Sequence, residues 1–68
     1  MNFASALFAM ERGHKVRRSH WGGYWCLEDG ELIMHCKDNR VLNLRESEDM
    51  NYTLRNISCD DWEIVKDY

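Results

Sequence analysis

The chain has 68 residues, of which 44% are hydrophobic, and it carries a formal net charge of −3. This length allows one small domain over residues 1–68, the apolar share is ordinary for a folded protein, and the mildly acidic charge argues against a nucleic-acid partner. A domain of this size buries only about 60% of the surface that its unfolded chain exposes, so we expect it to need partner subunits.

Residues 2–12 are predicted to form one short helix, with Asn2 as its N-cap and Gly13 as the left-handed residue after its end. The helix has a single apolar stripe, and Phe8 points away from it. Because so small a chain needs help with its core, we predict that Phe8 lies in a contact between subunits. The apolar stripe consists of Phe3, Ala6, Leu7 and Met10.

After this helix the chain has the texture of short strands joined by turns. Asp29-Gly30 is the strongest hairpin signal. Residues 46–49 are predicted as a mobile loop, and one helical turn is expected to begin near Asn56 or Ser58. The class is therefore α+β, with a short N-terminal helix packed on an antiparallel β-sheet of about four to five strands. The predicted strands are 14–18, 24–28, 31–36, 41–44 and 61–65.

The cysteines indicate a cytoplasmic protein with reduced thiols. Cys26, Cys36 and Cys59 are odd in number and form no CxxC pair. No secretory signal or membrane span is recognisable, which predicts no membrane partner. The three cysteines and His35 are donor types that zinc prefers, but their spacing resembles no structural zinc motif. We therefore predict no metal and no cofactor.

Catalysis is not favoured by the pattern of reactive residues. No glycine-rich loop follows a strand and opens a helix, so the phosphate-binding motifs are absent from the sequence. Cys26 with His20 or His35 has the residue types of a thiol–imidazole pair, but no spacing enforces their proximity. Asp60 and Asp61 are adjacent and would point to opposite faces of a strand. We predict that the protein is not an enzyme.

Ligand binding is favoured by the stretch KVRRSHWGGYW, from Lys15 to Trp25. Aromatic faces stack on nucleobases, guanidinium groups hold phosphate in forked hydrogen bonds, and glycine lets the backbone approach a ligand. These residue types in one stretch predict a site for a nucleotide-like molecule. The predicted ligand-binding residues are Arg17, Arg18, His20, Trp21, Gly22, Gly23, Tyr24 and Asn56.

Packing competes with binding for the aromatic residues. Strand alternation sends Tyr24 and Trp25 to opposite faces, so one of the two is expected in the core. Trp62 is also expected in the core, because small domains depend on large aromatic side chains. Trp21, on the glycine turn, is the tryptophan that packing explains least, and it is the residue we expect to contact a ligand.

Two end segments of the chain together resemble one known family. The segments MNFASALFAMERGHKVRRSHWGG and CDDWEIV are similar to the two terminal motifs of the second family of phage Thoeris anti-defence proteins. Arg18 and Trp21 match the first motif, and Asp61 and Trp62 match the second. The chain has Gly22 where the family commonly has Asn, and the segment before DWEIV lacks the usual Pro and Trp.

This resemblance implies a phage protein that acts in the host cytoplasm. Such proteins bind a nucleotide-derived immune signal, a glycocyclic ADP-ribose or a cyclic oligonucleotide, and sequester it without cleaving it. The family forms homo-oligomers, tetramers or dimers, with pockets between protomers. The alternative is a small phage inhibitor that acts on a host defence enzyme by direct protein contact, as anti-CRISPR proteins do, through Phe8, exposed aromatics and the acidic residues 46–49.

Overall fold

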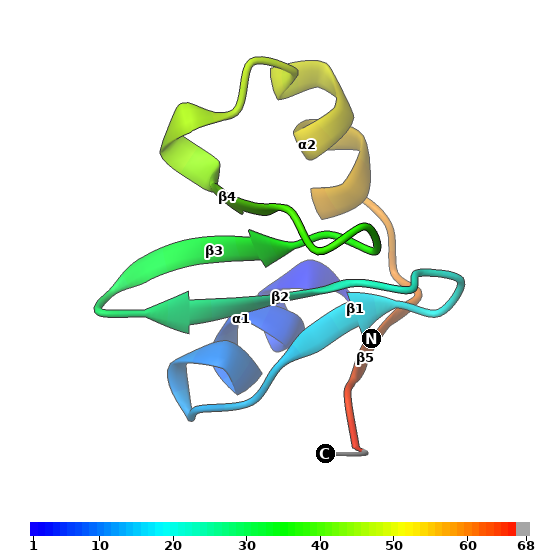
Figure 1. The fold of residues 1–68 in the computed structure, drawn as a ribbon. Coiled ribbons are helices and arrows are strands. Elements are labelled where there is room, and N and C mark those ends of the chain that lie inside the picture. The colour runs from blue at the N-terminus through cyan, green and yellow to red at the C-terminus, as the bar shows by residue number, and fades with distance from the viewer. Residues whose placement is uncertain (67–68) are drawn as a thin grey trace.

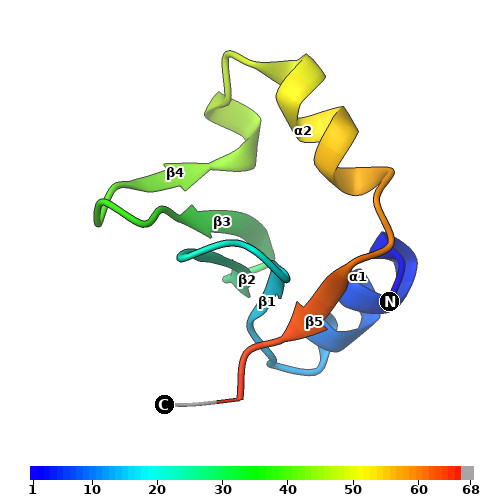
Figure 2. The ribbon, with the colours of Figure 1, turned by 90° about the vertical axis from the view of Figure 1, so that its right-hand side faces the viewer.

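The computed structural model describes residues 1–66, in which two α-helices lie on the same side of a five-stranded antiparallel sheet (Figures 1 and 2). The strand order is β4-β3-β2-β1-β5, so the last strand lies beside the first. This arrangement confirms the predicted α+β class. The helices are α1 (Phe3–Glu11) and α2 (Met50–Ile57), the strands are β1 (Val16–Arg18), β2 (Tyr24–Glu28), β3 (Glu31–His35), β4 (Val41–Asn43) and β5 (Trp62–Ile64), and a 3-10 turn η1 covers Leu44–Glu46.

Helix α1 forms for the local reasons that its sequence indicates. The Asn2 side chain accepts a hydrogen bond from the Ser5 backbone N–H at 2.9 Å, and Gly13 follows the helix with φ of 95°. Phe8 is 59% exposed, as predicted. The prediction for Leu7 is wrong, since this residue is 37% exposed; the buried arc of the helix is turned toward Ala9 instead.

The β2–β3 hairpin confirms the Asp29-Gly30 turn. Both residues have positive φ, 54° and 79°, which suits the tight turn between twisted strands. The register pairs Glu28 with Glu31 and, at the far end, Tyr24 with His35. Cross-strand partners share a face, so alternate residues of the hairpin point either to the helices or away from them.

The core lies between α1 and the helix-covered face of the sheet. Trp62 is 2% exposed and packs on Trp25, with ring centroids 5.0 Å apart, while Phe3 from α1 meets Trp62 edge-on at 5.2 Å. The expectation that either Tyr24 or Trp25 belongs to the core is confirmed for Trp25, and the expected burial of Trp62 is confirmed as well. Neither helix in residues 1–66 has the length and apolar content that a membrane span requires.

Helix α2 corrects the prediction for the polar segment. Helical structure begins at Met50, with Asp49 as N-cap accepting from the Tyr52 backbone N–H at 3.0 Å, instead of near Asn56 or Ser58. The buried residues of α2 are polar, since Thr53 and Asn56 are each 2% exposed. An apolar stripe is the main sequence signal for a helix, and here polar side chains occupy the buried side.

Candidate functional site

A cleft of about 680 Å³ opens between the N-terminal half of α2 and the helix-covered face of the sheet. This volume is within the range of about 300–1,000 Å³ that is usual for small-molecule sites. We call it the Trp21 cleft. It is lined by His20, Trp21, Gly22, Gly23, Trp25, Met34, His35, Cys36, Lys37, Leu42, Glu46, Ser47, Glu48, Asp49, Tyr52 and Thr53.

Trp21 is held in the cleft by backbone and ring contacts. Its backbone N–H donates to the Arg18 carbonyl at 3.0 Å, and its carbonyl accepts from Arg17 Nη1 at 3.1 Å. The indole packs against Trp25 and Trp62, with centroid distances of 5.4 and 5.2 Å, while remaining partly exposed. Packing therefore explains Trp21 better than its turn position suggested, and the same packing makes the indole a rigid surface for a flat ligand.

Lys37 and the acidic side chains of residues 46–49 give the lining of the Trp21 cleft both signs of charge. Lys37 and His20 lie on the side of the glycine turn, and the acidic side chains of residues 46–49 lie on the side of α2. Asp49 already caps α2, whereas Glu46 and Glu48 are exposed. A molecule that carries both phosphate and hydroxyl groups matches this division, because ammonium groups pair with phosphate and carboxylates accept from hydroxyls.

Lys37 is a cleft residue that the sequence interpretation missed, although a signal for it existed. A two-residue turn at Asp29-Gly30 sets the register of the hairpin. Extended beyond the Tyr24–His35 pair, that register brings Lys37 opposite Gly22. The side chain of Lys37 does lie there, with its Cγ 3.0 Å from the position that a Cβ on Gly22 would take.

Arg18 and Asn56 lie together, but outside the cleft lining. The guanidinium of Arg18 makes a forked contact with Asp61, at 2.8 and 3.2 Å, and donates to Asn56 Oδ1 at 2.8 Å. Its hydrogen bonds hold the pKa of Asp61 below its usual value. Asn56 in turn donates to the Tyr52 carbonyl. These contacts attach α2 to β1 and to the residue before β5, so they support one wall of the cleft.

Arg17 and Tyr24 occupy the other face of the sheet. Arg17 pairs with Glu63 at 3.0 Å, across the β1–β5 ladder. Tyr24 stacks on the ring of His35, with centroids 4.5 Å apart and planes 15° from parallel. Tyr24 lines a smaller pocket of about 220 Å³, which is also lined by Lys37 and Arg40. The predicted ligand-binding stretch is thus divided between two faces.

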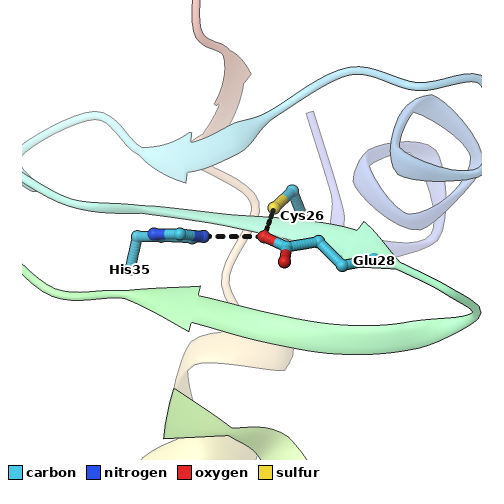
Figure 3. Close-up of side chains that lie close together, drawn as sticks. All are labelled: Cys26, Glu28 and His35. Atoms are coloured by element: carbon cyan, nitrogen blue, oxygen red, sulfur yellow. Dashed lines mark hydrogen bonds and ion pairs between the residues drawn. The ribbon is translucent and has the colours of Figure 1, made fainter. Parts of the chain in front are cut away.

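A cluster of reactive groups lies on the sheet face away from the helices (Figure 3). Glu28 Oε2 accepts from the Cys26 thiol at 3.4 Å and from His35 Nε2 at 2.8 Å. Burial, and then the hydrogen bond to Glu28, raise the pKa of Cys26 to about 11, so the thiol is protonated at neutral pH and is a poor nucleophile. Of the four zinc-type residues weighed from the sequence, the structure brings Cys26 and His35 together, whereas Cys36 and Cys59 are not in this cluster.

Comparison with known proteins agrees with the two end motifs. A family model described as Tad2-like, the Thoeris anti-defense 2-like domain, matches residues 1–65. No curated protein matches the chain. The match spans both α1 with its glycine turn and β5, so it covers every element of the fold and the complete Trp21 cleft.

Proposed function

The chain belongs to the Thoeris anti-defense 2-like family, whose role is to counter Thoeris defence, and on this premise we propose that it binds and sequesters a nucleotide-derived immune signal. The signal is a glycocyclic ADP-ribose or a cyclic oligonucleotide, held in the Trp21 cleft and released without cleavage. The observation that carries the proposal is a cleft of about 680 Å³ with an indole in its wall and both signs of charge at its rim.

Each part of such a ligand has a suitable partner in the cleft. A base stacks on Trp21, a contact worth about 1–3 kcal/mol. Phosphate oxygens lie toward Lys37 and His20, and ribose hydroxyls donate to the carboxylates of residues 46–49 on the α2 side. Phosphate binding by Lys37 differs from the expected role of Arg17 and Arg18, whose guanidinium groups already pair with Glu63 and Asp61.

The proposal is tested by mixing the protein with a library of cyclic oligonucleotides and cyclic ADP-ribose derivatives and recording native mass spectra. We expect a mass increase for one ligand class, and the same unaltered ligand in the supernatant after heating. A protein whose mass stays unchanged with every member of the library would contradict the proposal. Co-purification with a host enzyme in that case would support the protein-directed inhibitor instead.

Replacement of Trp21 tests whether the ligand binds in the Trp21 cleft and not at another aromatic side chain of the same stretch. We expect Trp21→Ala to weaken ligand binding by about fivefold to 150-fold, since the stacking energy of about 1–3 kcal/mol is lost, while the sheet remains folded. Tyr24→Ala is the matched control, because Tyr24 belongs to the same stretch and stacks on His35, but does not itself line the Trp21 cleft. Calorimetric titration measures both. Equal affinities of Trp21→Ala and wild type would remove Trp21 from the site.

Assembly into a homo-oligomer, a dimer or tetramer, is part of the proposal. Phe8 is 59% exposed beside Leu7 at 37%, and the Arg12 guanidinium lies 5.4 Å from the Phe8 ring centroid. An aromatic side chain exposed to this extent on a small domain is suited to a subunit contact.

We expect Phe8→Glu to shift the sedimentation profile toward smaller species, because a carboxylate at that contact is desolvated without a partner. Ala4→Glu is the control, since it adds the same charge to another exposed position of α1. A Phe8→Glu profile identical to that of wild type would show that the contact lies elsewhere.

A further inference from the structure

The ligand-binding proposal uses none of the side chains of Cys26, Glu28 and His35, of which only His35 also lines the Trp21 cleft, and the three donor atoms converge. One thiol, one carboxylate and one imidazole present ligand atoms that all lie within 4.8 Å of one another. Figure 3 shows the thiol of Cys26 and the ring of His35 both directed at the same carboxylate oxygen of Glu28. Sulfur, nitrogen and oxygen donors of these kinds are the ones by which proteins hold Zn²⁺.

Two of the three distances between donor atoms are close to those around a tetrahedral ion, and the third, between Cys26 Sγ and His35 Nε2, is within 4.8 Å and must approach about 3.5 Å. With Zn–S of about 2.3 Å and Zn–O of about 2.0–2.2 Å, neighbouring ligand atoms in a tetrahedron lie about 3.5 Å apart. The Cys26 Sγ to Glu28 Oε2 distance is already 3.4 Å. His35 Nε2 and the same oxygen are 2.8 Å apart and must separate by roughly half an ångström. Glu28 has the freedom for this, because its side chain is 53% exposed.

The sheet holds the three donors on one face. Cys26 and Glu28 are two residues apart on β2, and His35 lies opposite Tyr24 on β3. The ring of His35 is fixed by stacking on Tyr24, which leaves Nε2 directed at the cluster. Second contacts that orient a histidine ring are usual at metal sites. The donors are therefore arranged in advance by strand pairing.

Two features of the cluster oppose a cation. The Cys26 thiol must release its proton to solvent, and His35 must carry its ring proton on Nδ1 instead of Nε2, when the two become ligands. In addition, the Lys15 ammonium lies 4.8 Å from the Tyr24 ring centroid and is close enough to lower the pKa of both Cys26 and Glu28. Lys15 repels a divalent ion at this position, so its removal is an independent way to test for one.

We propose that Cys26, Glu28 and His35 bind one Zn²⁺ ion per chain, with the fourth coordination position open to solvent. Three protein ligands and a solvent molecule form the usual arrangement of an open zinc site. The ion ties the second half of β2 to the end of β3, on the sheet face away from the helices. This proposal goes beyond sequestration of a signal and does not depend on it.

Cobalt(II) is a probe for the thiolate ligand, because it replaces zinc and absorbs light. We expect titration of the metal-free protein with Co²⁺ to produce a thiolate-to-metal charge-transfer band and tetrahedral d–d bands that saturate at one ion per chain. Addition of Zn²⁺ should abolish both. Native mass spectrometry with Zn²⁺ should show the same stoichiometry. No band in the wild-type protein would overturn the proposal.

Variants locate the site. Cys26→Ser should remove the charge-transfer band, and Glu28→Gln, at a more exposed position where folding is less at risk, should weaken Co²⁺ binding at least tenfold. Cys36→Ser and Cys59→Ser are controls, because each removes one thiol that lies outside the cluster. Both variants should bind Co²⁺ as tightly as wild type does. Wild-type binding by Glu28→Gln, or loss of the band in either control, would assign the metal to other residues.

Lys15→Gln is expected to change the Co²⁺ affinity in the opposite direction from the ligand variants. Because the nearby ammonium is removed while the three ligands stay, this variant should bind Co²⁺ several-fold more tightly than wild type. Lys66→Gln, which changes the net charge equally at another exposed position, should not. An unchanged affinity in Lys15→Gln would mean that the ion binds away from Cys26 and Glu28.

Discussion

Replacement of Gly23 by alanine is expected to destabilise the domain by about 3 kcal/mol or more, because no space exists for a methyl group. A Cβ on Gly23 would lie 2.2 Å from the His35 carbonyl oxygen and 3.2 Å from two backbone atoms of Cys36. His35 is the last residue of the β2–β3 ladder and Cys36 follows it directly, so relief of the clash requires these ends of the two strands to separate. A domain of this size has a total unfolding free energy of only about 3–10 kcal/mol.

Gly22 provides the matched control for this change. A Cβ at that position meets Lys37 Cγ at 3.0 Å, and this atom belongs to a flexible, exposed side chain that can rotate away. We expect Gly22→Ala to change the unfolding free energy by less than about 1 kcal/mol. Urea denaturation followed by circular dichroism compares the two variants. Equal midpoints would mean that the backbone contact of Gly23 is not required.

Replacement of Trp62 by alanine is expected to cost about 3–5 kcal/mol, a large fraction of the unfolding free energy of about 3–10 kcal/mol that is usual for a domain of this size. The indole is 2% exposed, lies 5.0–5.2 Å from the rings of Phe3, Trp21 and Trp25, and donates from Nε1 to the Asn56 carbonyl at 3.0 Å. The same residue therefore fills the core, supports the wall of the Trp21 cleft and fastens α2.

Trp62→Phe distinguishes the contribution of the packed ring from that of the hydrogen bond donated by Nε1. A phenyl ring retains part of the packing but cannot donate to the Asn56 backbone carbonyl, which still accepts from the Cys59 backbone N–H at 3.3 Å, so the lost hydrogen bond costs about 0.5–1.5 kcal/mol. We expect this variant to fold and to bind the ligand more weakly than wild type, since α2 forms one wall of the cleft. Thermal unfolding and calorimetric titration measure these effects. Wild-type stability of Trp62→Ala would contradict the central place of the indole.

Much of the fold was predictable because its signals are local. The N-cap of Asn2, the left-handed Gly13 and the two-residue Asp29-Gly30 turn each act within a few residues, so helix α1 and the hairpin were predicted close to their observed bounds. The end motifs were sufficient for the family, which the match over residues 1–65 confirms. The alternation in YWCLE correctly divided Tyr24 from Trp25.

The remaining features depend on contacts between residues far apart in the chain. Helix α2 buries Thr53 and Asn56 instead of an apolar stripe, and Asn56 is satisfied there by Arg18, a strand residue 38 positions away. Arg18 also pairs with Asp61, and this pairing keeps its guanidinium out of the cleft lining. The charge of a side chain alone does not reveal such a partner.

The sequence by itself therefore determined the α+β class, the first helix and the hairpin, because periodicity, caps and turn residues act locally, and its end motifs determined the family. It placed Trp62 in the core but left the choice between Tyr24 and Trp25 open. Only the tertiary structure decided that α2 stands over the sheet to form the Trp21 cleft, that Lys37 faces it, and that Cys26, Glu28 and His35 meet on the opposite face. Those arrangements follow from strand register and from buried polar pairing, in which each group is placed by a partner distant in sequence.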